Sequence, residues 1–209
     1  SHMLGARAYK NEIAQISERM DYSGYEQHRP DYDTYVDSLL ARPDKPTFSE
    51  DRFRIDGQAP EKDYSTDDTR QGLWRSLMSG GVANIWGNLQ LTNEGSYEKG
   101  SVGYPNADEI KRYFNYSAVW YGHNMERCND LTDQMCLKTS DNGRLLFYGE
   151  SLDLIELDLS PMSGEAIPYF ALNTQTGDQE TGTLLAEDQL WAAPSNGDWV
   201  IAVGEFELP

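Results

Sequence analysis

The segment from Lys45 to Arg54 holds the residues best suited to carry out chemistry. It reads KPTFSEDRFR, so one carboxylate, Glu50, ends a short apolar stretch and is followed by Arg52, Arg54 and a long polar loop. A packed strand would fix the backbone beneath Glu50, while the loop after it could carry contacts to a substrate. The alternative is a strand-terminal Glu50 that pairs with one of the two arginines as a surface salt bridge.

The elements that would position Glu50 alternate between strands and helices. Strands are expected up to residue 26, over 47–50 and over 82–87, and helices over 31–40 and 66–79. The first helix would bury a stripe of Tyr32, Tyr35, Val36, Leu39 and Leu40, and the second begins at a Ser65 cap and ends at Gly80-Gly81. Such alternation predicts parallel strands with right-handed crossovers. Three strands make only part of a barrel, so its open edges must be covered by the second domain, another chain or missing sequence.

The pattern changes near residue 95, so we expect domains at 1–95 and 96–209. A short helix is predicted over 108–114. Segments of alternating polarity follow, separated by turn residues, and together they predict a small antiparallel β-sandwich. They span 145–148, 154–159, 169–172, 183–185 and 198–203. Trp191 and Trp199 are expected to pack within the sandwich, and Trp74 within the core of the first domain.

The charge of the chain excludes two classes of partner. Its 209 residues carry 35 acidic and 17 basic side chains, a formal net charge of −18. This charge repels phosphate backbones and anionic lipid, so neither nucleic acid nor a membrane surface is an expected partner, whereas neutral glycans remain open. No apolar run approaches the roughly 20 residues of a membrane helix. Ser1-His2-Met3 has the form of a cloning scar, so secreted and cytoplasmic locations both stay open.

Cys128 and Cys136 lie eight positions apart. They could close one small loop in an oxidising compartment, or remain two free thiols. A metal site built from these cysteines with the dispersed His28 and His123 is not expected. No metal or organic cofactor is predicted.

Three segments together resemble (β/α)₈-barrel glycoside hydrolases of the retaining clan that carry a C-terminal β-sandwich. They are YEQHRP at 25–30, KPTFSEDRFR at 45–54, and TRQGLWRSLMSGGVANIWG at 69–87. The resemblance covers the C-terminal half of the barrel and the sandwich. It implies that the strands ending near Glu26, Glu50 and Trp86 are the sixth, seventh and eighth. Glu50 would then inherit the role of nucleophile, which the seventh strand presents in this clan.

The resemblance leaves the acid/base open, because the fourth strand that carries it in the family seems to precede this chain. Asn11-Glu12 mimics the Asn-Glu pair of that strand, although no strand is predicted before it. Glu26 is the nearby substitute. Neighbouring strands lie about 4.8 Å apart, and the carboxyl groups of a retaining pair lie about 5 to 5.5 Å apart. We therefore expect Glu26, or a missing upstream carboxylate, to act as acid/base.

Substrate contacts are expected from five residues near the predicted strand ends, where aromatic rings stack on sugars and polar groups bind hydroxyls. They are Tyr25, His28, Arg52, Arg54 and Trp86. Each has a structural alternative, such as a core ring for Trp86 or a partner of local acids for an arginine. The sequence thus predicts a glycoside hydrolase. Its alternatives are a non-catalytic glycan-binding or interaction module and a homodimer that covers the open half-barrel.

Overall fold

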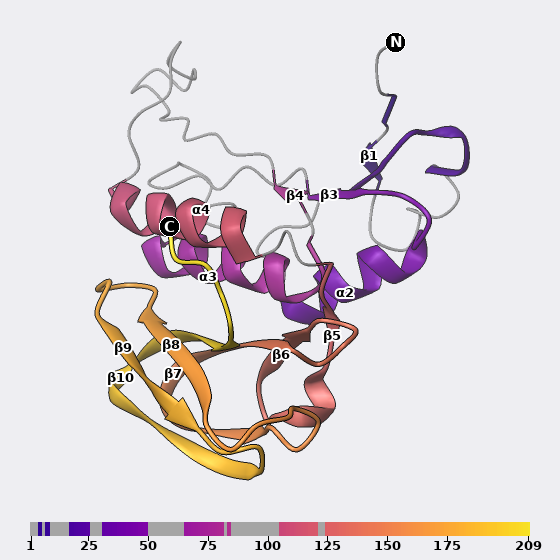
Figure 1. Ribbon diagram of the computed structural model, residues 1–209. Coiled ribbons are helices and arrows are strands. Elements are labelled where there is room, and N and C mark those ends of the chain that lie inside the picture. Colours follow the sequence, from indigo (N-terminus) through magenta and orange to yellow (C-terminus); the bar gives the residue numbers. More distant parts are fainter. Residues whose placement is uncertain are drawn as a thin grey trace. The chain divides into compact units, whose positions relative to one another are not determined.

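The computed structural model describes residues 4–5, 7–8, 17–25, 31–49, 65–81, 83–84, 105–120 and 124–209 (Figure 1). The chain divides into two compact units, Ser1–Ala107 and Asp108–Pro209. This division lies 12 residues beyond the boundary expected from the sequence, at 107 against 95. The helix that follows residue 107 belongs to the second unit, and each unit is described separately below.

The first unit contains a four-stranded parallel sheet. Its strands are β1 (Arg7–Ala8), β2 (Ser23–Tyr25), β3 (Thr47–Ser49) and β4 (Ala83–Asn84), in the order β1-β2-β3-β4. A 3-10 turn, η2 (Ser17–Arg19), precedes β2. Helix α2 (Tyr32–Ala41) connects β2 to β3, and helix α3 (Thr66–Met78) connects β3 to β4. Both predicted helices are confirmed, and the three predicted strands are confirmed where the structure describes them, at 23–25, 47–49 and 83–84. Strand β1 was not predicted.

Local sequence signals explain where the two helices begin and end. Asp31 caps α2 by accepting a hydrogen bond from the Thr34 backbone N–H at 2.8 Å. Ser65 and Asp68 form a reciprocal capping box at the start of α3. Beyond α3, Gly80 and Gly81 take φ values of 116° and 90°, a conformation that favours glycine and stops the helix.

The buried stripe of α2 differs from the predicted one. Thr34, Tyr35 and Ser38 are its buried residues, whereas Leu40 is 57% exposed. At 3.6 residues per turn, Leu40 lies about 140° around the helix from Tyr35. Including Leu40 in the stripe was therefore wrong, because the helix buries a narrower and more polar face.

The second unit consists of one helix and a six-stranded antiparallel sheet. Helix α4 (Ala107–Trp120) is longer than the predicted 108–114. The sheet has the order β5-β6-β7-β10-β8-β9, and a 3-10 turn, η5 (Asn129–Leu131), lies between β5 and β6. Its strands are β5 (Glu126–Arg127), β6 (Met135–Lys138), β7 (Arg144–Asp158), β8 (Ile167–Asn173), β9 (Gln179–Leu184) and β10 (Asp188–Gly204).

Residues from both halves of the long strands β7 and β10 belong to the hydrophobic core. The register between them shifts between Ala192 and Trp199, and Ser151 of β7 takes a positive φ of 52°. Ile155 in the far half of β7 packs in the same buried cluster as Phe147 in its near half. The described strands of the second unit form one connected antiparallel sheet, so a separate second sheet, and with it the predicted sandwich, is not confirmed.

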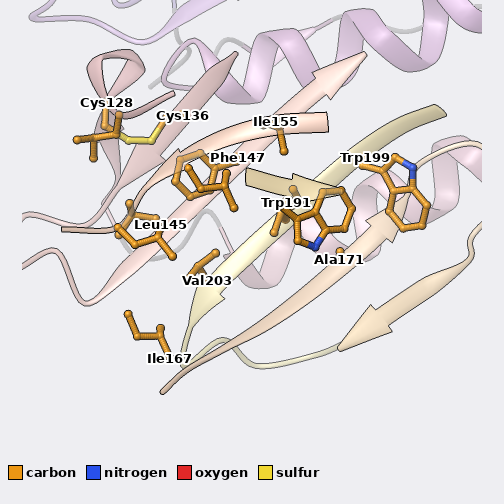
Figure 2. Packing of buried hydrophobic residues seen from close by; sticks show 14 of the residues in the cluster. Cys128, Cys136, Leu145, Phe147, Ile155, Ile167, Ala171, Trp191, Trp199 and Val203 are labelled. Atoms are coloured by element: carbon orange, nitrogen blue, oxygen red, sulfur yellow. A yellow bond between two sulfur atoms is a disulfide. The ribbon is translucent and has the colours of Figure 1, made fainter. Parts of the chain in front are cut away.

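The main hydrophobic core lies on one face of the antiparallel sheet. Figure 2 shows the two indole rings of Trp191 and Trp199 at one end of the cluster and a disulfide at the other. The ring centroids are 5.7 Å apart, and both side chains are buried as predicted. Cys128 and Cys136 form the disulfide, and both are buried. Of the two alternatives left by the sequence, the structure therefore has the disulfide.

Helix α4 packs on the opposite face of the same sheet. Tyr116 stacks on Phe170 with centroids 5.6 Å apart, and Trp120 contacts the edge of the same ring. Arg112 donates to the carbonyl oxygens of Thr174 and Gln175 at 2.8 and 2.9 Å. None of the helices in the described ranges is long and apolar enough to cross a membrane.

Candidate functional site

The candidate site lies where β2 and β3 end. These adjacent parallel strands pair in register, with Ser23 opposite Thr47 and Tyr25 opposite Ser49. Tyr25 and Ser49 are the last residues of their strands, and Glu26 and Glu50 follow them directly in the chain. The two predicted carboxylates thus come immediately after a register-matched pair of strand ends.

Most of the predicted site residues lie outside the described part of the chain. These are the two candidate catalytic residues and four of the five candidate substrate contacts, namely Glu26, Glu50, His28, Arg52, Arg54 and Trp86. Glu12, the weaker acid/base candidate, lies outside it as well, although β1 now supplies a strand four residues before it. The alternatives of a surface salt bridge for Glu50 and a core position for Trp86 are likewise untested.

Tyr25 is the one predicted site residue that the structure describes. Its side chain has no exposed surface and packs in a cluster with Tyr35 of α2, flanked by Leu39 and Ala41. The ring therefore points toward the helix layer rather than toward an open face of the sheet. This is the environment of a core residue, and the contact of Tyr25 with substrate stays a prediction.

The two faces of the parallel sheet differ in chemistry. Because side chains alternate along a strand, Ser23, Thr47 and Ser49 share the face of Tyr25. All three hydroxyls are buried and have no hydrogen-bond partner among the described residues. Phe48 points to the opposite face, where its ring lies 4.8 Å from that of Tyr22.

This polar face was missed by the sequence analysis, which read Thr47 and Phe48 simply as the start of an apolar strand. A possible signal was the alternation of hydroxyl residues around Phe48 in Thr47-Phe48-Ser49. In a barrel, the face away from the helices is the interior, so the side of Phe48 is the one that could face a ligand.

Hydrogen bonds at the other end of the sheet align β2 with β3. The Ser23 backbone N–H donates to the carbonyl oxygen of Pro46 at 2.9 Å. The Lys45 ammonium donates to the carbonyl oxygens of Glu18 and Met20, which lie just before β2. These contacts fix the starts of both strands, and strands of equal length then bring their carboxyl ends level.

Several charged side chains described in the first unit have structural partners. Arg42 pairs with Asp44 at 2.9 Å, and this hydrogen bond lowers the pKa of the exposed Asp44 to about 2. Arg70, almost fully buried, pairs with Asp67 at 2.8 Å. Within the described ranges, no group of three or more acidic, histidine or cysteine side chains has the arrangement of a metal site.

Solved structures of glycoside hydrolases have a similar fold. The chain aligns with a protein described as a glycoside hydrolase at a TM-score of 0.68 and 14% identity. It aligns with a glycoside hydrolase family 5 protein from Bacteroides vulgatus ATCC 8482 at 0.71 and 15%, and with a putative glycoside hydrolase from the same organism at 0.68 and 12%. No family model and no curated protein matches this chain.

The match covers nearly all of this chain but only part of each solved structure. The three alignments include 98%, 98% and 96% of this chain and 57%, 55% and 44% of the others. The chain therefore has a glycoside hydrolase fold that corresponds to about half the length of those proteins. At such low identity the likeness shows the fold, while the activity has to be argued from the residues.

Proposed function

We propose that this chain is a glycoside hydrolase that acts on an oligosaccharide or polysaccharide, with Glu50 as the nucleophile. Glu26, or a carboxylate outside this sequence, would act as acid/base. One observation carries the proposal: the last residues of β2 and β3, Tyr25 and Ser49, are opposite each other in a parallel ladder. The two glutamates that follow them are therefore candidates for a carboxylate pair.

The spacing of such a pair fits the chemistry. Adjacent strands lie about 4.8 Å apart, close to the roughly 5 to 5.5 Å of a retaining pair. If the alternation of β2 and β3 continued by one residue, Glu26 and Glu50 would share the face of Gly24 and Phe48, away from α2. Glu50 would attack the anomeric carbon, and Glu26 would protonate the leaving oxygen and then activate water. His28, Arg52, Arg54 and Trp86, which lie near the predicted strand ends, are proposed to contact the substrate.

The proposal is tested by comparing the wild type with Glu50→Gln and Glu26→Gln on aryl glycosides that have good and poor leaving groups. We expect Glu50→Gln to lose turnover on all substrates. Glu26→Gln should lose it mainly on poor leaving groups, which depend on protonation. Glu187→Gln is the matched control, because Glu187 is exposed and lies in the second unit.

The result that would count against the proposal is equal turnover by the wild type and Glu50→Gln, or no turnover by the wild type on any substrate. Azide provides a further check of the nucleophile. It should restore activity to Glu50→Ala by attacking the sugar in place of the missing carboxylate, with formation of a glycosyl azide.

A second candidate function is a non-catalytic carbohydrate-binding or interaction module. It is favoured by the fact that the chain spans only 44% to 57% of the three solved structures. A barrel segment without its catalytic complement could bind glycans and leave them intact. Binding of oligosaccharides by the wild type without any hydrolysis would select this candidate.

A homodimer is the remaining proposal for a partner. The described parallel sheet has four strands, and a closed barrel of this class has eight. Two copies related by a two-fold axis would supply that number and cover each other's sheet edges. Sedimentation over a range of concentrations tests this, and a strictly monomeric species whose stability does not change on dilution would refute it.

A further inference from the structure

A groove on the antiparallel sheet of the second unit has the form of a small-molecule site. It has a cavity volume of about 400 Å³ and lies over β8 and the ends of β9 and β10. This size is within the range of about 300 to 1,000 Å³ that is typical of ligand pockets. We call it the β9 groove, and the residues that line it include Thr181, Thr183, Phe170, Ala202, Glu205 and Phe206.

The floor of the β9 groove is formed by residues of three neighbouring strands. Phe170 of β8 pairs with Thr181 of β9 on one side and with Ala202 of β10 on the other. Paired residues of an antiparallel sheet share a face, so these three side chains form one row. The next row runs from Thr183 to Pro168, with Gly204 beside them in the lining. Three strands at about 4.8 Å spacing make this floor about 10 Å wide.

The polar groups of the β9 groove are free to bind a ligand. Thr181 and Thr183 are exposed, and their hydroxyls make no hydrogen bond with another described residue. The carboxylate of Glu205 is exposed and has no described partner, since only its backbone oxygen accepts a bond, from Arg144. The groove thus offers two hydroxyls and one carboxylate at its rim.

The apolar side of the β9 groove is held rigidly. Phe170 is stacked on Tyr116 of α4, and Phe206 contacts the edge of Trp120 at a centroid distance of 5.9 Å. The Trp120 indole N–H donates to the Glu207 carbonyl oxygen at 3.1 Å, which fixes the segment that carries Phe206. These contacts keep an apolar wall next to the polar rim.

We propose that the β9 groove binds a neutral saccharide, separate from the site at the ends of β2 and β3. Sugars present hydroxyls on their rims and C–H groups on their faces, which matches free hydroxyls and a carboxylate beside an apolar floor. No lysine or arginine lines the groove, and the chain carries a charge of −18, so an anionic ligand would be repelled. The site takes the ligand class of the proposed function but does not depend on catalysis.

The test is a titration of the ¹⁵N-labelled full chain, carrying Glu50→Gln to prevent cleavage, with cellohexaose, xylohexaose and mannohexaose. We expect at least one of them to shift the amide signals of 181–183 and 204–206. The double variant Thr181→Val/Thr183→Val keeps the shape of both side chains and removes two hydrogen bonds. It should weaken binding about 5-fold or more. Glu205→Gln should weaken it as well, whereas Glu187→Gln, an equal loss of charge at an exposed position away from the groove, should not.

Three results would overturn the proposal. In the first, none of the three sugars shifts these amides at millimolar concentration. In the second, only an apolar dye does so. In the third, these amides and those of β9 shift with protein concentration alone, which would show that a second copy pairs with the edge strand. If the wild type hydrolyses a substrate but the amide signals of the β9 groove do not shift, only the proposal that the groove binds saccharide is refuted. If the amide signals shift but no hydrolysis occurs, only the proposed activity is refuted.

Discussion

Removal of the Cys128–Cys136 disulfide should destabilise the second unit by an amount that follows from the loop it closes. The loop contains nine residues, counted from 128 to 136. In the chain-entropy treatment, a closed loop of this size stabilises the folded state by about 2.6 kcal/mol at 25 °C. For a unit of 102 residues, from 108 to 209, this corresponds to a fall in Tm of about 10 to 20 °C.

The assay is urea unfolding followed by tryptophan fluorescence, with and without a phosphine reductant. Trp191 and Trp199 lie in the same buried cluster as the disulfide, so their emission reports on this core. Because both sulfur atoms are buried, the protein should be unfolded and refolded in reductant before the measurement. The control is Cys128→Ala/Cys136→Ala, whose unfolding midpoint should not respond to the reductant.

Two outcomes would refute this reasoning. If the untreated protein, unfolded in denaturant, titrates as two free thiols, the cross-link does not form under those conditions. If the midpoints with and without reductant coincide, the cross-link forms but constrains the unfolded chain less than its length implies.

Three further predictions concern single side chains. Trp199→Ala should cost about 3 to 5 kcal/mol because it empties a buried site, whereas Leu190→Ala, at 64% exposure, should change the free energy of unfolding by less than about 0.5 kcal/mol in the same urea assay. Ser65→Ala removes the cap of α3 and should cost about 1 kcal/mol by urea unfolding, with Ser65→Gly closer to the wild type. Hydrogen bonds from Thr139 and from a backbone N–H lower the pKa of Asp141, so this carboxylate stabilises the fold above its unfolded pKa and loses that contribution as pH falls through its folded pKa. Thr139→Val should raise the pKa of Asp141 toward its ordinary value in an NMR titration, and an unchanged pKa would contradict the assignment.

The helices of the first unit were predictable because their signals are local. Asp31, the Ser65–Asp68 box and Gly80-Gly81 act within one turn of the helix they start or stop. The two-residue strand β1 gave no such signal, because two residues are too few to show an alternation. The parallel register of β2 and β3 also depends on contacts between distant segments, and those are not written in either segment alone.

The positions of the turns in the antiparallel sheet were predictable from the sequence, whereas the number and length of its strands were less so. Polar and glycine residues over 140–143 and 173–177 have the composition of turns, and both segments form turns between strands. Strand β7 was predicted as two separate strands, because the polar residues around Ser151 have the composition of a turn. Strands β5 and β6 and the first half of β10, which are short or interrupted by Pro194 and Gly197, were also missed.

For the candidate site, the sequence identified the residue types but not their surroundings. Glu50 and Glu26 were chosen as strand-terminal carboxylates, and the strands before them are present in register. Tyr25 was chosen as an aromatic residue near a predicted strand end, yet its ring is buried against Tyr35. The face to which a strand residue points depends on the helix that covers the sheet, and a single sequence does not show this.

The order of strands in the second unit has a consequence for its synthesis on the ribosome. β10 lies between β7 and β8, although it is the last of the six strands in the chain. The β8–β9 hairpin can form as soon as it emerges, but it cannot join β7 until β10 has been translated and inserted between them. During that interval β7 and β8 each expose an unpaired edge, so the nascent unit is open to aggregation until its last strand arrives.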